Sequence, residues 1–412
     1  MFKTTLASCA LLVGDSIACM GNNPHILFLI RSLERGGAER QLVMLASGLR
    51  RQGWLVTVAC FYAGGPFQRD LEHAGVHVIN LAKRGRWDMF GFLWRLMRMF
   101  RKTRPDIVHG YLPVSNILSL LVRLSRPSSL VVWGVRASNV DFSRYDWLSR
   151  VIFWLQCRLA RYADLSIVNS SAGMEHHVVR GFPQGAMRVI QNGIDTSHFR
   201  FDPAGRERMR HAWGVPQSAV LVGLVGRVDP MKDHPTFLRA AARLILTDPR
   251  WWFVCVGDGA PEDMARLSKQ ATELGLEQRL IWAGACDNMS AAYSAFDMAA
   301  SSSCGEGFPN VVAEAMACGR PCVVTDVGDS ARIVGEFGVV VPPRDAAALS
   351  DGICRLHARL ERNCTALTQQ VREHVIKSFG QQALVNETVE YLWNSTGLGD
   401  HLANAIRPRD DI

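Results

Sequence analysis

The sequence predicts an α/β fold of two doubly wound domains, each a parallel sheet covered by helices. From Pro24 onward, short apolar or β-branched runs alternate with longer helical patterns, which is typical of parallel sheets. The alternation pauses in a polar stretch after Gly193 and then begins again, and a length of 412 residues also favours two domains. We therefore expect domains over residues 24–200 and 201–382, and a separate final segment over 383–412.

The runs that resemble buried strands form one series before the polar stretch and a second series after it. Most positions in them are apolar, as expected for strands that are covered on both faces. The first series is HILFLI (25–30), LVTVACF (55–61), VHVINL (76–81), IVHGY (107–111), LVVWGV (130–135), LSIVNS (165–170) and MRVIQNG (187–193). The second series is AVLVGLVGR (219–227), WWFVCVGDG (251–259), RLIWAG (279–284), FDMAASSS (296–303), PCVVTD (321–326) and GVVVPP (338–343).

Residues 1–23 precede the first strand and allow several interpretations. They contain one lysine and a short apolar run, which faintly resembles a signal peptide. Met20 stands just before the first strand, so a start codon assigned too early, or a disordered extension, explains the segment as well. No stretch of the sequence reaches the roughly 18 uninterrupted apolar residues of a membrane span.

The composition is that of a globular protein with an uneven charge. Apolar residues make up 48% and charged residues 20% of the chain. Residues 1–195 hold 24 Lys or Arg against 12 Asp or Glu, so the first half is strongly basic. This points to an anionic partner for that half: a membrane surface, a phosphorylated substrate or a nucleic acid. The 11 cysteines show no CxxC pair or metal-ligand spacing, and we interpret them as reduced and mostly buried.

The segment SSSCGEGFPNVVAEAMACG (301–319) has the punctuation of a short helix at a ligand site. Pro309 suits a first helical position and Gly319 a helix end. The free N–H groups at such a helix start favour an anion. Glu306 on the preceding loop and Glu314 inside the helix could accept hydrogen bonds from hydroxyls at two ends of one ligand, such as a nucleotide sugar. Alternatively, Glu306 only complements the helix dipole and Glu314 is an ordinary surface residue.

Basic residues follow the first strand of the second domain. Arg227 directly follows the strand, and Lys232 precedes the next helix. Because ligands of open α/β sheets lie beyond the carboxyl ends of strands, we expect these cations to meet a diphosphate in a cleft between the domains. The alternative is a solvated basic loop. In the first domain, Gly36 and Gly37 lie between the first strand and its helix and would let the backbone approach a ligand closely. No carboxylate cluster suggests a divalent cation, so we expect no metal.

These blocks resemble the retaining glycosyltransferases of family 4, which have the GT-B fold of two Rossmann-like domains. Glu306 and Glu314 match the E-x7-E signature of that family. The similarity runs from about Pro24 to residue 395, with its recurring blocks in the right order. They are GGAER (36–40), VIQNGID (189–195), GRVDPMKDH (226–234) and GEGFPNVVAEAMACGRPCVVTDVG (305–328).

The resemblance implies transfer of a sugar from a nucleotide donor, with UDP favoured, and retention of the anomeric configuration. Residues 24–200 would bind the acceptor and residues 201–382 the donor, with the last helix returning to the first domain. Arg227 and Lys232 would bind the diphosphate and, with Glu306, act in catalysis. By the same resemblance, Glu314 would bind the ribose of the donor, and Gly36 and Gly37 would lie near its phosphates. Glu306 would bind the transferred sugar, together with the backbone of Gly307, Phe308, Pro309 and Asn310. No cofactor is implied, since the nucleotide sugar is a substrate.

The first domain departs from the family pattern at the end of its fifth strand. Many relatives carry a histidine there, whereas VVWGVRASN offers Arg136. Arg136 could bind an acceptor phosphate but could not be a general base. His109, at the end of IVHGY, is the nearest histidine in a comparable position, and we name both residues as acceptor-binding candidates. A satisfied structural histidine is the alternative for His109.

Residues 83–105 predict an amphipathic helix at the inner face of the cell membrane. Its aromatic residues include Trp87, Phe90, Trp94 and Phe100, and arginines and a lysine lie between them. Such a helix suits an anionic bilayer, where each cation adds about 1 kcal/mol of binding free energy. Alternatively, the apolar face packs on the sheet. Membrane contact fits a cytoplasmic enzyme with a lipid-linked or polysaccharide acceptor, as in lipopolysaccharide or exopolysaccharide synthesis, and no nucleic-acid-binding module accompanies the charge.

Other functions remain compatible with such a two-domain fold. A sugar-nucleotide epimerase would use the same donor cleft but needs acid and base groups around the sugar carbon. The protein could also bind a sugar nucleotide without catalysis, as the partner of another transferase. Such a protein would not need an intact set of charged residues, which here is Arg227, Lys232, Glu306 and Glu314.

Overall fold

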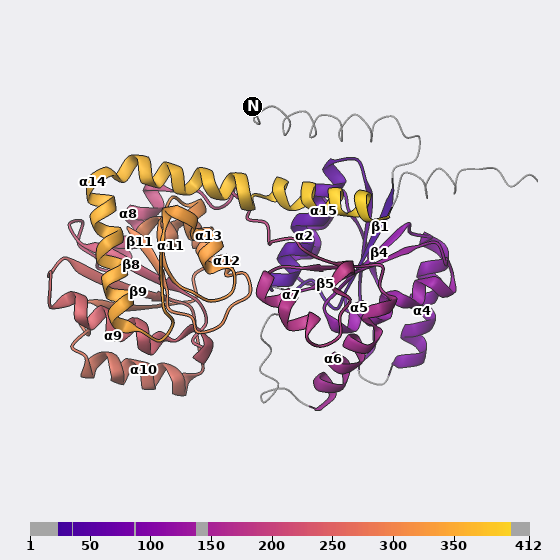
Figure 1. Cartoon of the computed structure of the whole chain (residues 1–412), viewed down its shortest axis with the longest axis horizontal. Helices are drawn as coiled ribbons and strands as arrows, with labels where there is room; N and C mark the ends of the chain where they lie inside the picture. The colour runs from indigo at the N-terminus through magenta and orange to yellow at the C-terminus, as the bar shows by residue number, and fades with distance from the viewer. Residues whose placement is uncertain (1–23, 35, 86–87, 137–146, 397–412) are drawn as a thin grey trace, which may run out of the picture. The chain divides into compact units, whose positions relative to one another are not determined.

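The computed structural model describes residues 24–34, 36–85, 88–136 and 147–396 (Figure 1). The expectations for residues 1–23, for Trp87 and for 397–412 lie outside the described residues. Within them, the chain divides into two compact units. The first contains residues 24–168, 174–190 and 384–396, and the second contains residues 169–173 and 191–383. This division falls after Ile190, earlier than the boundary expected at 200 and 201.

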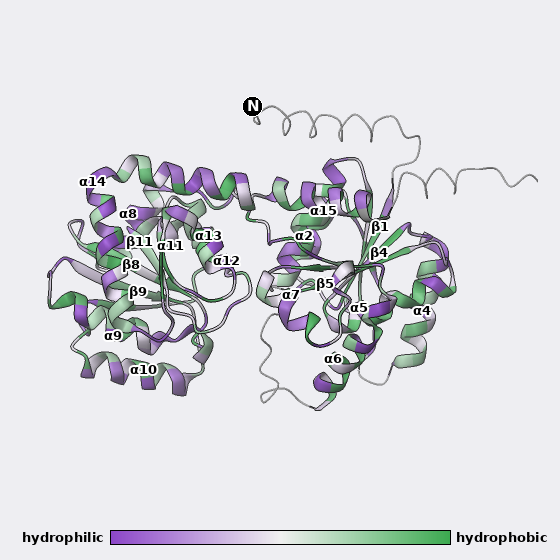
Figure 2. Cartoon of the chain, in the orientation of Figure 1, coloured by the Kyte–Doolittle hydropathy of each residue, from purple (hydrophilic) through white to green (hydrophobic). Residues whose placement is uncertain are grey.

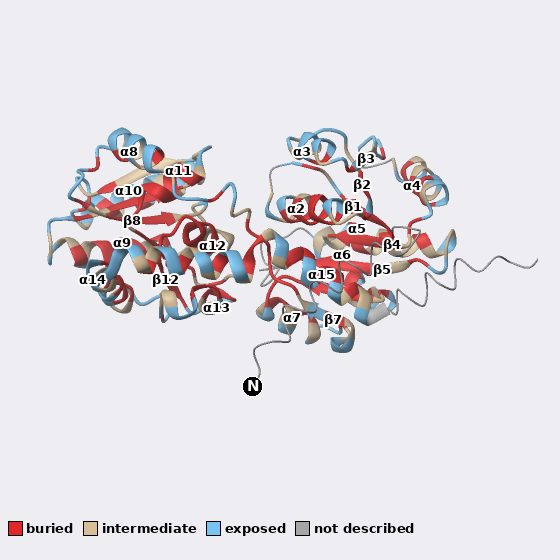
Figure 3. Ribbon diagram, turned by 90° about the horizontal axis from the view of Figure 1, so that it is seen from above, coloured by how far each residue is buried: buried red, intermediate tan, exposed pale blue. Residues whose placement is uncertain are grey.

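The first unit is built on a parallel sheet of seven strands in the order β3-β2-β1-β4-β5-β6-β7. Strand β1 lies centrally, between β2 and β4. Each run of the first predicted series forms a strand, and Figure 3 shows most of this sheet buried. The strands are β1 (His25–Ile30), β2 (Leu55–Cys60), β3 (His77–Asn80), β4 (Ile107–Tyr111), β5 (Leu130–Val135), β6 (Leu165–Val168) and β7 (Met187–Val189).

Helices cover both faces of this sheet. Two helices, α2 and α15, pack with one set of alternating strand residues, among them Ile26 and Phe28. Helix α4, helix η1 and the end of α6 pack on the opposite face, with Leu27 and Leu29. The helical segments are α2 (Gly37–Arg51), α3 (Phe67–His73), α4 (Met89–Thr103), α5 (Pro113–Ser119), η1 (Leu120–Leu124), α6 (Trp147–Leu159), η3 (Ala160–Tyr162), α7 (Ser171–Val178), η4 (Gln184–Ala186) and α15 (Gln381–Thr396).

Helix α4 buries one apolar face and exposes another. Phe92, Leu96 and Phe100 are buried in the core. Phe90 is 91% exposed and Trp94 is 62% exposed. Packing on the sheet therefore accounts for only part of the apolar surface that the sequence places in this helix, whose mixed hydrophobic and polar residues are visible in Figure 2.

The second unit is built on a parallel sheet of six strands in the order β10-β9-β8-β11-β12-β13. The strand order reverses between β8 and β11, which places a topological switch point beside the end of β8. The strands are β8 (Val220–Val225), β9 (Trp251–Val256), β10 (Leu280–Gly284), β11 (Met298–Ser301), β12 (Cys322–Thr325) and β13 (Val339–Val341). The two doubly wound α/β units predicted from the sequence are therefore confirmed.

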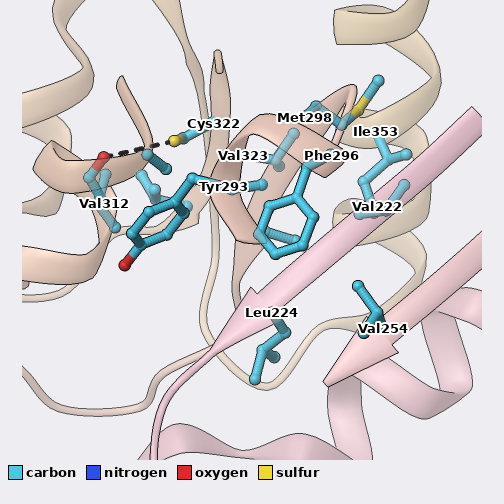
Figure 4. Packing of buried hydrophobic residues seen from close by; sticks show 14 of the residues in the cluster. Val222, Leu224, Val254, Tyr293, Phe296, Met298, Val312, Cys322, Val323 and Ile353 are labelled. Carbon is cyan, nitrogen blue, oxygen red and sulfur yellow. Dashed lines mark hydrogen bonds between the residues drawn. The ribbon is translucent and has the colours of Figure 1, made fainter. Parts of the chain in front are cut away.

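The core of the second unit joins this sheet to the helices around it. Figure 4 shows Tyr293 and Phe296 packed near Val222 and Leu224 of β8, with Ile353 of α14 beside them. Helix α14 is long but changes direction at Asn363, whose φ of −158° and ψ of 69° are not helical. The helical segments are α8 (Pro203–Ala212), η5 (Pro230–Lys232), α9 (His234–Ile245), α10 (Pro261–Glu273), α11 (Met289–Ala295), α12 (Asn310–Ala317), α13 (Ser330–Val334), η6 (Gly335–Phe337) and α14 (Ala346–Phe379).

Candidate functional site

A cavity of about 540 Å³ lies at the carboxyl ends of β8, β9 and β10. Its volume is in the range of small-molecule sites. Glycines at the strand ends shape it, because the loops approach each other very closely. A Cβ atom on Gly257, whose φ is +135°, would lie 2.2 Å from the carbonyl oxygen of Gly226. The residues that line the cavity are Val225, Gly226, Arg227, Val256, Gly257, Asp258, Gly259, Ala285, Cys286 and Met289.

Backbone hydrogen bonds hold the loops around this cavity. Gly257 N donates to Gly284 O at 2.8 Å, and Val228 N donates to Asp258 O at 2.9 Å. The carboxylate of Asp258 accepts a further bond from Ala285 N at 3.0 Å. The cavity is thus preformed by mutually bonded strand ends. Asp258 was not among the predicted site residues, although the Gly-Asp-Gly that ends the strand-like run WWFVCVGDG was a usable signal.

Lys232 and Glu306 form an ion pair next to this cavity. Lys232 Nζ lies 2.6 Å from Glu306 Oε1, and the side chains are 22% and 12% exposed. Ser303 Oγ donates to the same carboxylate oxygen at 2.7 Å. The lysine stem passes the backbone of Gly226, where a Cβ atom would lie 3.2 Å from Lys232 Cε. The ammonium group is therefore held at the end of β8, close to the turn that carries Arg227.

The loops that carry this ion pair are fixed to each other. Cys304 N donates to Met231 O at 2.8 Å, and Ser302 Oγ donates to Lys232 O at 2.8 Å. Strand β12 contributes through Thr325 Oγ1, which donates to Ser303 O at 2.6 Å. These contacts fix the two loops to each other, and the side chains of Lys232 and Glu306 meet between them.

His234 lies two residues beyond Lys232 and is buried. Burial lowers its pKa to about 4, and the neighbouring Lys232 charge contributes in the same direction. The imidazole is therefore neutral near pH 7. The positive charge at this end of β8 comes from Arg227 and Lys232 rather than from the histidine.

A tight turn supports the loop that bears Glu306. Gly328 has a φ of +56°, and a Cβ atom there would lie 2.5 Å from the carbonyl oxygens of Glu306 and Gly307. Asp329 N donates to Gly307 O at 2.9 Å, while the Asp329 carboxylate accepts from Gln191 Nε2 at 3.1 Å. Asp329 is thus a positioning residue that the sequence analysis did not single out.

Residues 308–310 lead into helix α12, which begins at Asn310 rather than at Pro309. Pro309 precedes the first helical residue, so the predicted start is one residue too early. Phe308 is buried in the core and meets Phe379 edge to face at 5.7 Å. Asn310 Oδ1 accepts from Asn192 Nδ2 at 2.9 Å. Because the Phe308 side chain is buried, a ligand would contact this residue through its backbone.

Glu314 projects from α12 into a buried polar contact. The residue is 6% exposed, so it is not an ordinary surface residue. The hydroxyl of Tyr293 donates to Glu314 Oε2 at 2.8 Å. Burial, and then the adjacent carboxylate, raise the pKa of Tyr293 well above its usual value, so the phenol remains a neutral donor. Tyr293 therefore orients the Glu314 carboxylate, a role that no motif in the sequence predicts.

The acceptor candidates lie in the first unit. His109 is 0% exposed and packs against Phe28 and Tyr111 at ring distances of 5.3 and 4.8 Å. Burial, and then the charge of Arg136, hold its pKa well below the usual value. With no exposed atom, His109 has no surface with which to touch an acceptor directly. Arg136 Nη2 donates to the Tyr111 hydroxyl at 3.0 Å, and this links Arg136 to the same aromatic cluster.

The paired glycines of the first unit stand at the start of α2. Gly36 is the residue before the helix and Gly37 is its first residue. A Cβ atom on Gly36 would lie 2.0 Å from a carboxylate oxygen of Glu39. The structure thus pairs Lys232 with Glu306 and places Arg227 in the lining of the cavity. These residues and Glu314 belong to the second unit, and the glycines and the acceptor candidates belong to the first.

The part of the chain that the structure describes contains neither a cluster suited to a metal ion nor a helix suited to span a bilayer. No group of three or more His, Cys, Asp or Glu side chains in residues 24–34, 36–85, 88–136 and 147–396 is arranged to hold a metal ion. Within the same ranges, no helix has both the length and the apolar character needed to span a bilayer.

Sequence relatives match this chain over roughly half of their length. A D-inositol 3-phosphate glycosyltransferase of Saccharomonospora viridis is 32% identical over 225 residues, which are 52% of this chain and 51% of the relative. The lipopolysaccharide core biosynthesis mannosyltransferase LpsB of Rhizobium meliloti is 30% identical over 40% of this chain and 48% of its own.

Solved structures match the chain almost completely at low identity. Anabaena Alr3699/HepE in complex with UDP has a TM-score of 0.75 and 22% identity, and the match covers 90% of this chain and 100% of that one. Sucrose-phosphate synthase of Thermosynechococcus elongatus has a TM-score of 0.71 and 21% identity, over 92% and 100% of the two chains. Together with the two parallel-sheet units, these likenesses establish a GT-B fold.

Profiles of two families match the two halves of the chain. The profile described as Glycosyltransferase Family 4 matches residues 35–198, and the profile described as Glycosyl transferases group 1 matches residues 219–359. Taken with the relatives and the fold, these matches show that the chain belongs to the family 4 glycosyltransferases.

Proposed function

We propose that this protein is a retaining, metal-independent glycosyltransferase. It transfers a sugar from a nucleotide-sugar donor, preferably a UDP-sugar, to a glycan or a lipid-linked acceptor in surface polysaccharide synthesis. The observation that carries the proposal is the Lys232–Glu306 ion pair at 2.6 Å, held at the end of β8 next to a cavity of about 540 Å³ at the carboxyl ends of β8, β9 and β10. The complexes of Anabaena Alr3699/HepE with UDP and with UDP-glucose support a uridine nucleotide.

The cations act on the leaving group in the proposed reaction. When the bond between the sugar C1 and the phosphate oxygen breaks, negative charge develops on the diphosphate, and Arg227 and Lys232 stabilise it electrostatically. The acceptor oxygen forms its bond to C1 on the same face. Its proton passes to the departing phosphate oxygen, so no carboxylate nucleophile is required.

Carboxylates and backbone groups position the donor. Glu306, already oriented by Lys232 and Ser303, accepts hydrogen bonds from the transferred sugar. Glu314, oriented by Tyr293, accepts from the ribose. Backbone groups of residues 307–310 complete the sugar contacts. Fixed acceptors of this kind reduce the reorganisation needed at the moment of reaction.

In this proposal the first unit binds the acceptor. Arg136 offers a guanidinium that suits a phosphate on the acceptor, while Gly36 and Gly37 let the backbone approach the donor phosphates. His109 acts only indirectly, through its contact with Tyr111. An acceptor phosphate is consistent with relatives named for inositol 3-phosphate, and action at the inner face of the cell membrane fits a lipid-linked acceptor.

The direct test is a donor screen. Purified protein is incubated with radiolabelled UDP- and GDP-sugars and a membrane extract, with and without EDTA, and the linkage of the product is determined by NMR. The proposal expects an α-linked product from an α-linked UDP-sugar, at a rate that EDTA does not change. An inverted linkage or loss of activity with EDTA contradicts it. An epimerised nucleotide sugar formed without acceptor would instead identify an epimerase.

Cysteine alkylation tests whether the nucleotide occupies the cavity. Cys286 lines the cavity, whereas Cys354 and Cys364 are exposed on α14. We expect UDP to slow the alkylation of Cys286 by iodoacetamide at least about tenfold at saturation, because the ligand covers the thiol. Mass spectrometry of tryptic peptides measures all three sites, and Cys354 and Cys364 are internal controls. Equal rates at Cys286 with and without UDP would place the nucleotide elsewhere.

A further inference from the structure

Helix α6 is an apolar helix that is barely buried. It carries eight large apolar side chains between Trp147 and Leu159, yet the single buried residue in it is Gln156. Trp147 is 71% exposed and Trp154 is 57% exposed. A helix of a soluble protein normally turns its apolar side inward, so this distribution is inverted.

Helix α6 shares its side of the first unit's sheet with two other elements that expose apolar residues. Helices α4, η1 and α6 all pack on the same face of the seven-stranded sheet, through residues such as Phe92, Val122 and Cys157. Each of the three also exposes large apolar side chains. They are Met89, Phe90 and Trp94 on α4, Leu124 on η1, and Trp147, Val151, Trp154 and Leu155 on α6.

The charge of these segments indicates an anionic partner. No acidic residue occurs between Met89 and Pro105 or between Trp147 and Ala163, whereas arginines occur in both segments and a lysine in the first. Arginine guanidinium groups lie over exposed tryptophan rings in both helices: Arg98 over Trp94 and Arg158 over Trp154, each at 5.3 Å from the ring centroid. Tryptophan beside arginine is suited to the boundary between acyl chains and anionic headgroups.

We infer that α4, η1 and α6 together form one docking surface for an anionic lipid bilayer. Aromatic and aliphatic side chains of all three elements enter the headgroup boundary, and the cations contact anionic headgroups. The inference deepens the lipid-linked-acceptor part of the proposed function and rests on it for its biological purpose. A single α4 contact, as the sequence predicted, would leave the exposed tryptophans of α6 without a role.

Vesicle co-sedimentation tests the surface directly. The full chain is mixed with phosphatidylcholine vesicles with or without phosphatidylglycerol, and binding to the anionic vesicles should fall in high salt. Trp147→Ser/Trp154→Ser should weaken binding at least about tenfold through lost apolar burial. Arg98→Gln/Arg158→Gln should weaken it about 30-fold, because each cation adds about fivefold at an anionic surface.

Matched controls come from the second unit. Leu246→Ser removes a side chain that is 86% exposed, and Lys269→Gln removes an ammonium whose side chain is 80% exposed; neither should change vesicle binding. Wild-type binding to neutral and anionic vesicles alike, or unchanged binding of the Trp147→Ser/Trp154→Ser variant, overturns the inference. So does self-association in sedimentation velocity that the same variants abolish, since the surface would then be a dimer interface.

The alkylation of Cys286 separates this inference from the proposed function. If vesicle binding fails while UDP still protects Cys286, only the docking surface is wrong. If vesicle binding holds and UDP gives no protection, the surface stands and the donor site is wrong.

Discussion

Lys232→Ala lowers kcat for sugar transfer about 10²–10³-fold, the loss typical of removing one group that stabilises developing negative charge. The ammonium is fixed before any ligand binds, by its 2.6 Å contact with Glu306 and by its passage along Gly226. It therefore needs no reorganisation when the diphosphate leaves. Steady-state kinetics with the donor found in the screen measure the effect, and KM should change less than kcat because the charge grows in the transition state.

Two variants show whether the loss comes from the diphosphate or from Glu306. Lys232→Ala also leaves the Glu306 carboxylate without its cation, so part of the effect could be a displaced loop. In Lys232→Ala/Glu306→Gln that unpaired charge is absent. The comparison is with Glu306→Gln alone: if Lys232→Ala causes no further loss of kcat in the Glu306→Gln background, Lys232 acts only through Glu306, and its proposed role at the diphosphate is wrong. Lys269→Ala, a highly exposed lysine on α10, should retain wild-type kinetics.

The strand series could be predicted because burial on both faces produces continuous apolar runs. HILFLI becomes β1, and every one of its residues is buried. The end of α12 could be predicted as well, because Gly319 takes a φ of +73°, which is unfavourable for residues other than glycine. These features depend on residues that are close together in the chain, so they can be predicted from the sequence.

The cavity and the state of His109 could not be predicted in the same way. The cavity depends on Gly257 approaching Gly226 from another strand, a contact between residues distant in sequence. His109 ends a strand, where side chains are often accessible, yet Phe28 of β1 and Tyr111 pack around it. Strand-end position alone therefore misjudged its exposure. Lys232 and Glu306 were predicted from motifs, and the structure shows that their side chains form an ion pair.

The largest effect on stability is expected at Asp297, which joins α8 to the start of β8. Its carboxylate pairs with Arg206 at 2.6 Å and with Arg210 at 3.3 Å, and it accepts Leu221 N at 2.7 Å. The Arg210 side chain is 0% exposed. Burial acts to lower the pKa of Arg210, and the Asp297 charge counteracts this. Removing Asp297 therefore leaves a buried guanidinium without its counter-charge.

Asp297→Ala should lower the free energy of unfolding of the second unit by about 3–5 kcal/mol, as when one partner of a buried pair is deleted. Urea denaturation, with hydrogen exchange of the β8 and β11 amides to locate the change, measures it. Asp263→Ala removes an exposed partner of Arg266 and should cost about 0–1 kcal/mol. Because Arg210 also donates to the carbonyls of Ala295 and Ala219, an Asp297→Ala loss as small as that of Asp263→Ala would mean that carbonyl groups alone satisfy the buried guanidinium.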